Sequence, residues 1–328
     1  MPFNCFESTY SLSFDSSDSC WPDVLKRTHG KSKGSKKRGH ALGNDTIFAI
    51  RHIRNLHGHS HPFLVEASDG YWYVVKSDVG GTGSNYLFNE YAGNALYRAY
   101  GLPVPAWKPI LLTNQFIDEN FSRWPTVFGD ICPPQSGLAF GSRYLGGDGI
   151  RLLEVVPNSG FGRISNRSNF WLAWLIDICA LHADSRQAVF QVWNQRLMQA
   201  VFIDHGHAFG GPRGDAKPHF RRPCYADERV YQPFDLGSNE AMLSRLKSLK
   251  SDLLWYQVQS MPYEWKTLSG FRQCADCLNR LENAKLLEEV VDTLREAVSH
   301  RQYCGNFIHE RYQGAKASLL LTRMPVSG

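Results

Sequence analysis

The order of elements along the 328-residue sequence predicts an α+β protein, with short strands first and helices later. Runs of β-branched and aromatic residues alternate with turn signals from residue 47 onward, and leucines recur at helical spacing between residues 239 and 300. Hydrophobic residues make up 43% of the chain and charged residues 20%. These are ordinary globular values, which exclude a wholly disordered chain or a fibrous repeat.

The strands of the first half are predicted from short apolar runs that are bounded by turns. Asp69-Gly70 is the strongest turn signal, because an Asp-Gly pair favours a tight hairpin. The strand after this hairpin ends on Lys76. The predicted strands cover residues 47–53, 63–67, 71–76 and 107–112.

The helices are predicted from apolar residues spaced three and four apart. The first helix, residues 85–100, is expected to end at Gly101, a residue type that commonly terminates helices. The other predicted elements are a connector at 137–144, an apolar helix at 169–181, a strand pair at 190–193 and 199–203, and helices from 239 to about 300.

The first 44 residues differ from the rest in composition. Residues 26–38 carry seven lysines and arginines with no acid between them, which exceeds the formal net charge of +5 for the whole chain. The interspersed glycines and serines favour a flexible, solvated tail. Contact of this segment with nucleic acid or an acidic partner is the alternative.

Four charged residues occur in an order that suits phosphoryl transfer. Lys76 ends a strand, Glu90 lies on the next helix, Asp184 follows a buried helix, and Asp204 ends a strand. Such chemistry uses a lysine on the nucleotide phosphates and an acidic helix residue that holds the lysine. It also uses one aspartate that orients the acceptor hydroxyl and another that binds Mg²⁺.

The segments around these residues resemble HipA-like kinases over residues 47–300. The pairs of segments near Glu90 and Asp204 are more specific than the strand that ends on Lys76. The matching segments are YVVK (73–76), LFNE (87–90), GLPVP (101–105), FGSR (140–143), DSRQAVF (184–190) and FIDHGHAFGG (202–211).

The resemblance implies a two-lobed, protein-kinase-like fold with a β-rich N-lobe and a mainly helical C-lobe. The tail would cover residues 1–44, the N-lobe 45–142 and the C-lobe 143–328. The family uses ATP and Mg²⁺, and its best understood members phosphorylate Ser or Thr of a protein. A protein substrate is therefore expected here.

The resemblance also assigns roles to individual residues. Lys76 would contact phosphates, Glu90 would anchor Lys76, Asp184 would be the catalytic base, and Asp204 would be the metal ligand. Three further residues resemble the family's phosphate-side loop, and residues 138–142 would form the hinge that meets adenine. These loop residues are Gly58, Ser60 and His61.

Three departures from the family pattern leave a second function open. The catalytic stretch usually reads Asn-x-Asp-Arg, whereas this chain has His182 and Ser185 at the outer positions. The position of a second metal ligand, five residues after the base, holds Val189, so Gln187 or a water would have to fill that place. The alternative is a pseudokinase that binds nucleotide or acts as a scaffold without turnover.

Other clusters allow competing metal sites. Cys274 and Cys277, with His300 and Cys304, supply four potential zinc ligands, but the pair lies in a helical stretch, which favours packed thiols. The alternating histidines at 57–61 suggest a metal on a strand or, more simply, a solvent-facing turn. His205 and His207 flank a glycine in the same way, next to Asp204.

Several other classes of protein are excluded or disfavoured. The sequence has no Gly-x-Ser-x-Gly elbow of a serine hydrolase, and the glycines at 80–83 lack the ending of a phosphate-binding Walker loop. The longest apolar stretch, 170–181, is too short to cross a bilayer. With no export signal recognised, we expect a cytoplasmic protein with reduced thiols and no membrane partner. The oligomeric state and the phosphoacceptor stay open.

Overall fold

The computed structural model describes most of the chain between residues 47 and 289. The described residues are 47–56, 60–77, 85–121, 134–147, 149–154, 156, 158–184, 187–192, 197–213, 239–283 and 285–289. The predicted tail therefore lies outside the described residues. All described residues fall within one unit, Asn44–Gly328. The predicted lobe boundary at residues 142 and 143 stays a prediction.

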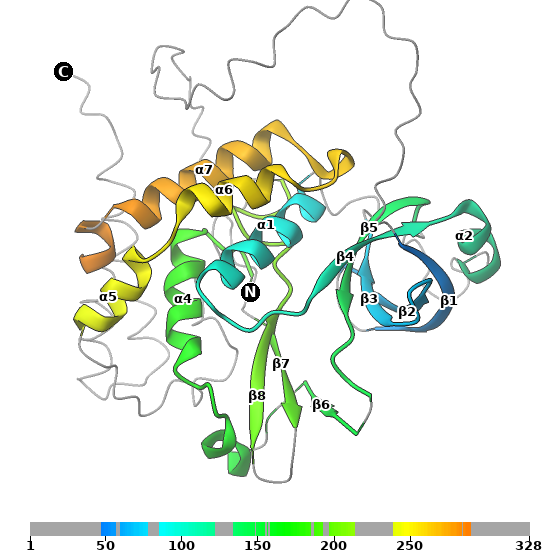
Figure 1. Ribbon diagram of the computed structural model, residues 1–328, viewed down its shortest axis with the longest axis horizontal. Helices are drawn as coiled ribbons and strands as arrows, with labels where there is room; N and C mark the ends of the chain where they lie inside the picture. Colours follow the sequence, from blue (N-terminus) through cyan, green and yellow to red (C-terminus); the bar gives the residue numbers. More distant parts are fainter. Residues whose placement is uncertain are drawn as a thin grey trace, which may run out of the picture. The chain divides into compact units, whose positions relative to one another are not determined.

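Five strands form a closed barrel, which Figure 1 shows beside the helices. The strands follow one another around the barrel in the order β1-β2-β3-β5-β4, and all pairs are antiparallel except β1 with β4. Side chains that alternate along the strands, among them Val65 and Val75, fill the interior. The bounds are β1 (Ile47–Asn55), β2 (Phe63–Ala67), β3 (Trp72–Lys76), β4 (Trp107–Leu112) and β5 (Gly137–Arg143).

β5 corrects two of the sequence-based expectations. The predicted connector at 137–144 is mostly a strand, and residues 140–142 pair with β3 on one side and β4 on the other. The backbone groups of residues 140–142 are used by the sheet on both sides, so this part of the predicted hinge at 138–142 is not free to meet adenine, and the rest of the hinge stays a prediction. Gly141 is a strand glycine because a Cβ there would collide with the side chain of Ile110.

Helix α1 (Tyr86–Ala99) connects β3 to β4 and carries much of the core. Nearly all of its side chains are buried, and it contacts α6 and α7. A helix that is buried on all sides needs apolar residues all round, and its few polar residues need internal partners. Gly101 ends this region of the chain with φ +70°, as the sequence predicts. Helix α2 (Asn114–Phe121) covers one part of the barrel core.

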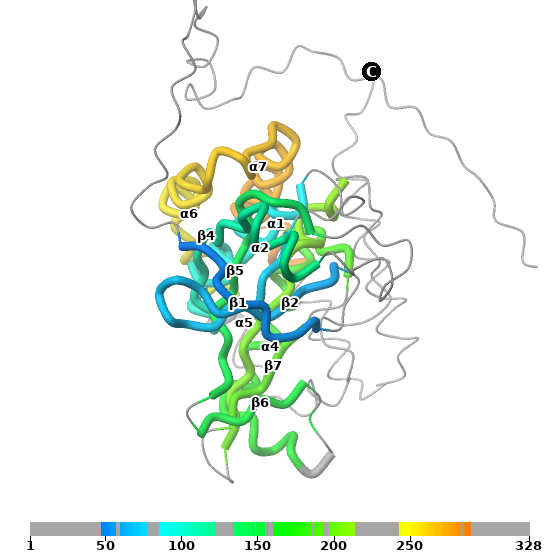
Figure 2. The backbone as a smooth tube through the Cα atoms, turned by 90° about the vertical axis from the view of Figure 1, so that its right-hand side faces the viewer, coloured from blue at the N-terminus to red at the C-terminus, as the bar shows by residue number. Residues whose placement is uncertain are grey.

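The second half contains a small sheet and the remaining helices. Strand β7 pairs with β6 and β8 in an antiparallel sheet, and β6 and β7 lie side by side in Figures 1 and 2. The bounds are β6 (Arg151–Leu153), η2 (Asn158–Arg163), α4 (Asn169–Cys179), β7 (Gln187–Val192), β8 (Met198–Ile203), α5 (Asn239–Lys247), α6 (Ser251–Gln259), η4 (Tyr263–Trp265) and α7 (Leu268–Glu282).

The α+β prediction is confirmed, with the barrel first and the helices later. Within the described ranges, every helix is too short or too polar to span a bilayer.

Candidate active site

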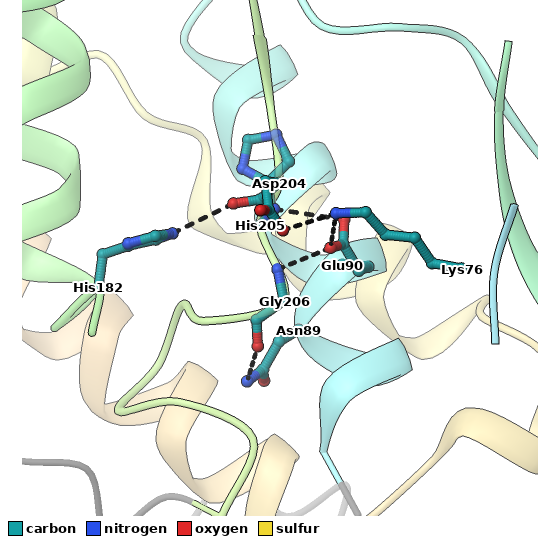
Figure 3. A network of polar contacts seen from close by, with 7 residues as sticks. All are labelled: Lys76, Asn89, Glu90, His182, Asp204, His205 and Gly206. Atoms are coloured by element: carbon teal, nitrogen blue, oxygen red, sulfur yellow. Dashed lines mark hydrogen bonds and ion pairs between the residues drawn. The ribbon is translucent and has the colours of Figure 1, made fainter. Parts of the chain in front are cut away.

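Three predicted residues meet at one point: Lys76, Glu90 and Asp204. The Nζ of Lys76 lies 2.5 Å from Oε1 of Glu90 and 2.6 Å from Oδ1 of Asp204. Lys76 comes from the end of β3, Glu90 from α1, and Asp204 from the residue after β8. Figure 3 shows the lysine reaching across to both carboxylates. The structure therefore brings together groups that are 128 residues apart in sequence.

The centre is buried, but not evenly. The side chain of Glu90 is 2% exposed and that of Lys76 10%, whereas that of Asp204 is 19% exposed. Glu90 is thus the inner partner of the ammonium. Asp204 is the carboxylate that a bound molecule can reach.

The electrostatics of the centre keep the lysine charged. Burial by itself lowers the pKa of Lys76, but the carboxylates of Asp204 and Glu90 outweigh it and hold this pKa well above its usual value. Burial would raise the pKa of Asp204, yet the adjacent ammonium of Lys76 outweighs it and lowers this pKa. Burial raises the pKa of Glu90, and Lys76 offsets only part of that rise.

Glu90 also fixes the chain that follows Asp204. Its carboxylate accepts hydrogen bonds from the backbone N–H of Gly206 (2.9 Å) and of His205 (3.3 Å). Asp204 itself has φ +62°, in the left-handed region that non-glycine residues rarely occupy. Such strain persists where surrounding contacts hold the backbone in place, and it is often found at functional sites.

Two glycines allow this segment to lie directly against its neighbours. A Cβ on Gly206 would collide with the ring of Tyr86, and a Cβ on Gly93 would collide with the side chain of His205. Tyr86 lies under the centre, with its ring centroid 5.9 Å from the Nζ of Lys76. Small residues at these two positions are therefore required by the close packing of α1 against residues 204–211.

The segment around Asp184 lies beside the segment that follows Asp204. The two are joined by backbone hydrogen bonds from Ala183 N to His207 O, 2.8 Å, and from Phe209 N to Ala180 O, 2.7 Å. The carboxylate-bearing residue Asp184 is exposed. Asp184 is therefore open to solvent, and its role as catalytic base stays a prediction.

His182 bridges the two segments, and sequence reasoning treated it only as a departure from the family pattern. Its Nδ1 lies 2.8 Å from the carbonyl oxygen of Asp184, and its Nε2 lies 3.3 Å from the carbonyl oxygen of Asp204. Figure 3 shows His182 and Lys76 approaching Asp204 from opposite sides. The signal was its position two residues before the predicted base.

The other residues predicted for the site lie around this centre or outside the described residues. Gln187 is exposed and pairs with Ile203 in the β7–β8 ladder, one residue from Asp204. Ser60 lies near the site, beside the buried phenol of Tyr86. Burial raises the pKa of this phenol, and the side chain of Ser60 opposes the rise. His61 has φ +45° in the same turn. Gly58 lies outside the described residues, as do the histidines at 57 and 59.

The donor set around Asp204 fits a magnesium ion that is held mainly by phosphate and water. Mg²⁺ takes one or two carboxylates and keeps several waters, so it needs no all-protein cage. In the part of the chain that the structure describes, no three His, Cys, Asp or Glu side chains converge as a metal site. Asp204 offers a reachable carboxylate beside the ammonium that would face the phosphates.

The cysteine pair predicted as a competing zinc site is buried in the helical core. Cys274 and Cys277 on α7 are free thiols and lie in the same apolar cluster as Cys179 on α4. The other two proposed ligands, His300 and Cys304, lie outside the described residues.

The architecture is that of a protein-kinase-like fold. The proinflammatory kinase CtkA of Helicobacter pylori is similar in structure, with a TM-score of 0.51 and 11% sequence identity over 75% of this chain and 98% of that one. Two structures of the Golgi casein kinase, one with Mn and ADP bound, have TM-scores of 0.42 and identities of 11% and 12%. The first of these covers 74% of this chain and 72% of that one; the second covers 72% of each. The two TM-scores of 0.42 are too low to support the fold, which rests on the similarity to CtkA.

A model of the HipA-like kinases matches part of the chain. Residues 47–171 match the model of this family, which covers the barrel, α1 and the start of α4. The resemblance predicted from the sequence motifs is thereby confirmed for this part of the chain. No curated protein matches the sequence significantly.

Proposed function

We propose that the protein is an ATP- and Mg²⁺-dependent phosphotransferase that acts on a Ser or Thr hydroxyl of a protein. The observation that carries this proposal is the Lys76 ammonium between an inner and an outer carboxylate, 2.5 Å from Glu90 and 2.6 Å from Asp204. A fixed positive charge in a site of low water content stabilises the charge that develops on a transferred phosphoryl group.

The residues of the chain divide the work as follows. Lys76 steadies the nucleotide phosphates, and Glu90 holds Lys76 and the backbone after Asp204 in position. Asp184, exposed beside that backbone, orients the acceptor hydroxyl and takes its proton. Asp204, with Gln187 one strand away, would hold Mg²⁺. The ion, when bound, would neutralise phosphate charge.

One observation favours a pseudokinase as the second candidate. The position of a second metal ligand is Val189, which lies inside β7 and pairs with Val201 of β8. An apolar strand residue cannot coordinate a metal, so the site has fewer protein ligands than a two-metal kinase.

Labelled ATP separates the two candidates. The protein is incubated with labelled ATP and Mg²⁺, alone and with cell lysate, and phosphorylated residues are mapped by mass spectrometry. Transfer onto Ser or Thr supports the phosphotransferase. A rise in melting temperature on adding ATP and Mg²⁺, without any transfer, supports the pseudokinase. Absence of both effects overturns both functions.

The basic segment 26–38 supports a separate binding proposal, because its seven positive charges suit an acidic partner or nucleic acid. Deletion of residues 1–44 tests it. Binding with unchanged affinity and salt dependence after the deletion would refute it.

A further inference from the structure

Asn89 is a buried polar residue that the proposed mechanism does not use. It immediately precedes Glu90 on α1 and is fully buried. Its side-chain Nδ2 donates hydrogen bonds to the carbonyl oxygens of Gly206 (3.1 Å), Ala208 (2.8 Å) and Gly211 (3.2 Å). One amide group therefore contacts three carbonyls of the segment that follows Asp204, and Figure 3 shows the first of these contacts.

The chemistry of these contacts requires a donor at this position. Carbonyl oxygens only accept hydrogen bonds, so the amide nitrogen of Asn89, and not its oxygen, must face them. The Oδ1 atom on the other side has no hydrogen-bond donor among the described residues. An aspartate of nearly the same shape would point an acceptor at three acceptors, which is repulsive.

The backbone of this segment is shaped so that its carbonyls converge. Phe209, Gly210 and Gly211 all have positive φ values, of 55°, 84° and 84°. Successive left-handed residues curl the chain into a tight loop. The outer side of the loop is held by a hydrogen bond from Gly210 N to Leu181 O, 3.0 Å. On the side of α1, the hydrogen bonds from Asn89 fix the same loop.

Two adjacent residues of α1 thus bind the same loop, one as a hydrogen-bond acceptor and the other as a donor. The Glu90 carboxylate accepts the N–H of Gly206, while the Asn89 amide donates to the C=O of the same residue. Gly206 comes two residues after Asp204, so fixing both of its polar groups limits where the strained Asp204 backbone can lie.

We propose that Asn89 is a positioning residue that sets the place of the Asp204 carboxylate through the loop 206–211. The proposal deepens the proposed function and rests on it for the role of Asp204. Asn89 acts through the backbone of this loop, which its amide contacts at three carbonyls. Its contribution is to keep the outer carboxylate where the ammonium of Lys76 and a bound cation can share it.

Asn94 supplies a matched control on the same helix. It is buried to 1% exposure, and its Nδ2 donates to a backbone carbonyl, that of Pro105, at 3.3 Å. The same substitutions at Asn89 and Asn94 therefore remove the same buried donor, near the loop in one case and away from it in the other.

The experiment compares N89A and N89D with N94A and N94D in the full chain. Three quantities are measured: the melting temperature, hydrogen exchange of the backbone amides of residues 204–212, and the Mn²⁺ dissociation constant with a non-hydrolysable ATP analogue present, from the EPR signal of free Mn²⁺. We expect both Asn89 variants to speed exchange in this segment and weaken Mn²⁺ binding, each at least about tenfold, with N89D more affected. Both Asn94 variants should change each quantity less than twofold.

The outcomes separate a positioning role from a structural one. Equal changes in the Asn89 and Asn94 variants at matched melting temperature, or faster exchange with unchanged Mn²⁺ binding, would overturn the proposal. If N89D does not fold, Asn89→Ser, which keeps a small donor, takes its place with the same expected direction. Unaltered protein that binds Mn²⁺ and nucleotide without transferring phosphate would refute only the phosphotransferase function.

Discussion

Two buried polar clusters in the described part of the chain differ in whether a counter-charge opposes the effect of burial. One is the charged centre formed by Lys76, Glu90 and Asp204. The other is the thiol cluster, defined as Cys179, Cys274 and Cys277. In the charged centre, opposite charges outweigh burial and keep the pKa of the lysine high. In the thiol cluster, nothing outweighs it.

The thiol cluster shows what burial does to ionisable groups without a matched partner. Burial raises the pKa of Cys179 and of Cys277 to about 12, and it raises that of Cys274 well above the usual value. The guanidinium of Arg280 works against this rise but does not reverse it, and its Nε donates to the carbonyl oxygen of Cys179 at 2.5 Å. In the charged centre, by contrast, the counter-charges in direct contact with Lys76 keep the ammonium charged despite burial.

The largest effect is expected when the charged centre loses its cation. Lys76→Ala leaves two carboxylates next to each other in the interior, which costs roughly 3–5 kcal/mol of unfolding free energy. Phosphate transfer should fall by at least about 100-fold, since a preorganised charge at the reacting group is lost. Urea unfolding and labelled transfer measure both effects.

Lys108→Ala is the control for this loss. Lys108 also pairs with an aspartate, but it is 44% exposed, and its contact with Asp69 is 3.5 Å. It should change stability and transfer little. Equal losses in the two variants would contradict the contrast between buried and exposed charge.

A smaller effect is expected from crowding the loop beside the centre. Gly206→Ala forces the new methyl group against the ring of Tyr86, which should cost about 1–3 kcal/mol of unfolding free energy and reduce transfer. Gly162→Ala is the matched control, because a Cβ there meets nothing within 4 Å. Comparison of the two melting curves tests this, and a Gly206 variant as stable as the Gly162 variant would refute the packing argument.

The thiol cluster predicts a loss of stability in alkali. A thiol whose pKa is raised by folding stabilises the folded state fully below its unfolded pKa of about 9. This contribution is lost as the pH rises to the folded pKa of about 12 for Cys277. The unfolding free energy should therefore fall between these pH values, by at most about 1.4 kcal/mol per pH unit for each thiol.

The variant Cys277→Ala isolates this effect from the titration of Lys76. It should flatten the alkaline slope, although it lowers stability at neutral pH by removing a buried side chain. The slope is that of the unfolding free energy against pH, measured by urea unfolding at pH 8 to 12. An unchanged slope would show that burial does not raise the pKa of Cys277.

The smallest effect is expected at the surface. Arg51 and Glu66 form an ion pair at 2.6 Å, with side chains 62% and 31% exposed. A double-mutant cycle with alanine at both positions should give a coupling of less than about 1 kcal/mol, which high salt reduces further. A coupling as large as that at Lys76 would contradict the expected difference between interior and surface ion pairs.

The sequence predicted much of this fold because local patterns were strong. The strands at 63–67 and 107–112 have the predicted bounds, and the end of α1 at Gly101 followed from glycine's preference for positive φ. β5 was missed, since its residues were predicted to form a connector. The actual reason for Gly141 is the side chain of Ile110, a contact from another strand that no local pattern carries.

The candidate site shows the same limit. Lys76, Glu90 and Asp204 were predicted as a set, from residue type, order and the resemblance. Asn89 and the bridging role of His182 were missed, because their partners are backbone carbonyls that any residue could supply. A polar residue on an otherwise apolar helix was the available signal for Asn89.

The most direct test of the account is transfer of labelled phosphate from ATP by the unaltered protein and by Asp204→Asn, with urea unfolding of both. Asparagine has the same size and tolerates φ +62°, so the fold should survive while the charge is lost. We expect transfer by the unaltered protein and at least about a 100-fold loss in a variant that still unfolds cooperatively, because a preorganised charge typically contributes a factor of that order. Equal transfer by a well-folded Asp204→Asn would contradict it.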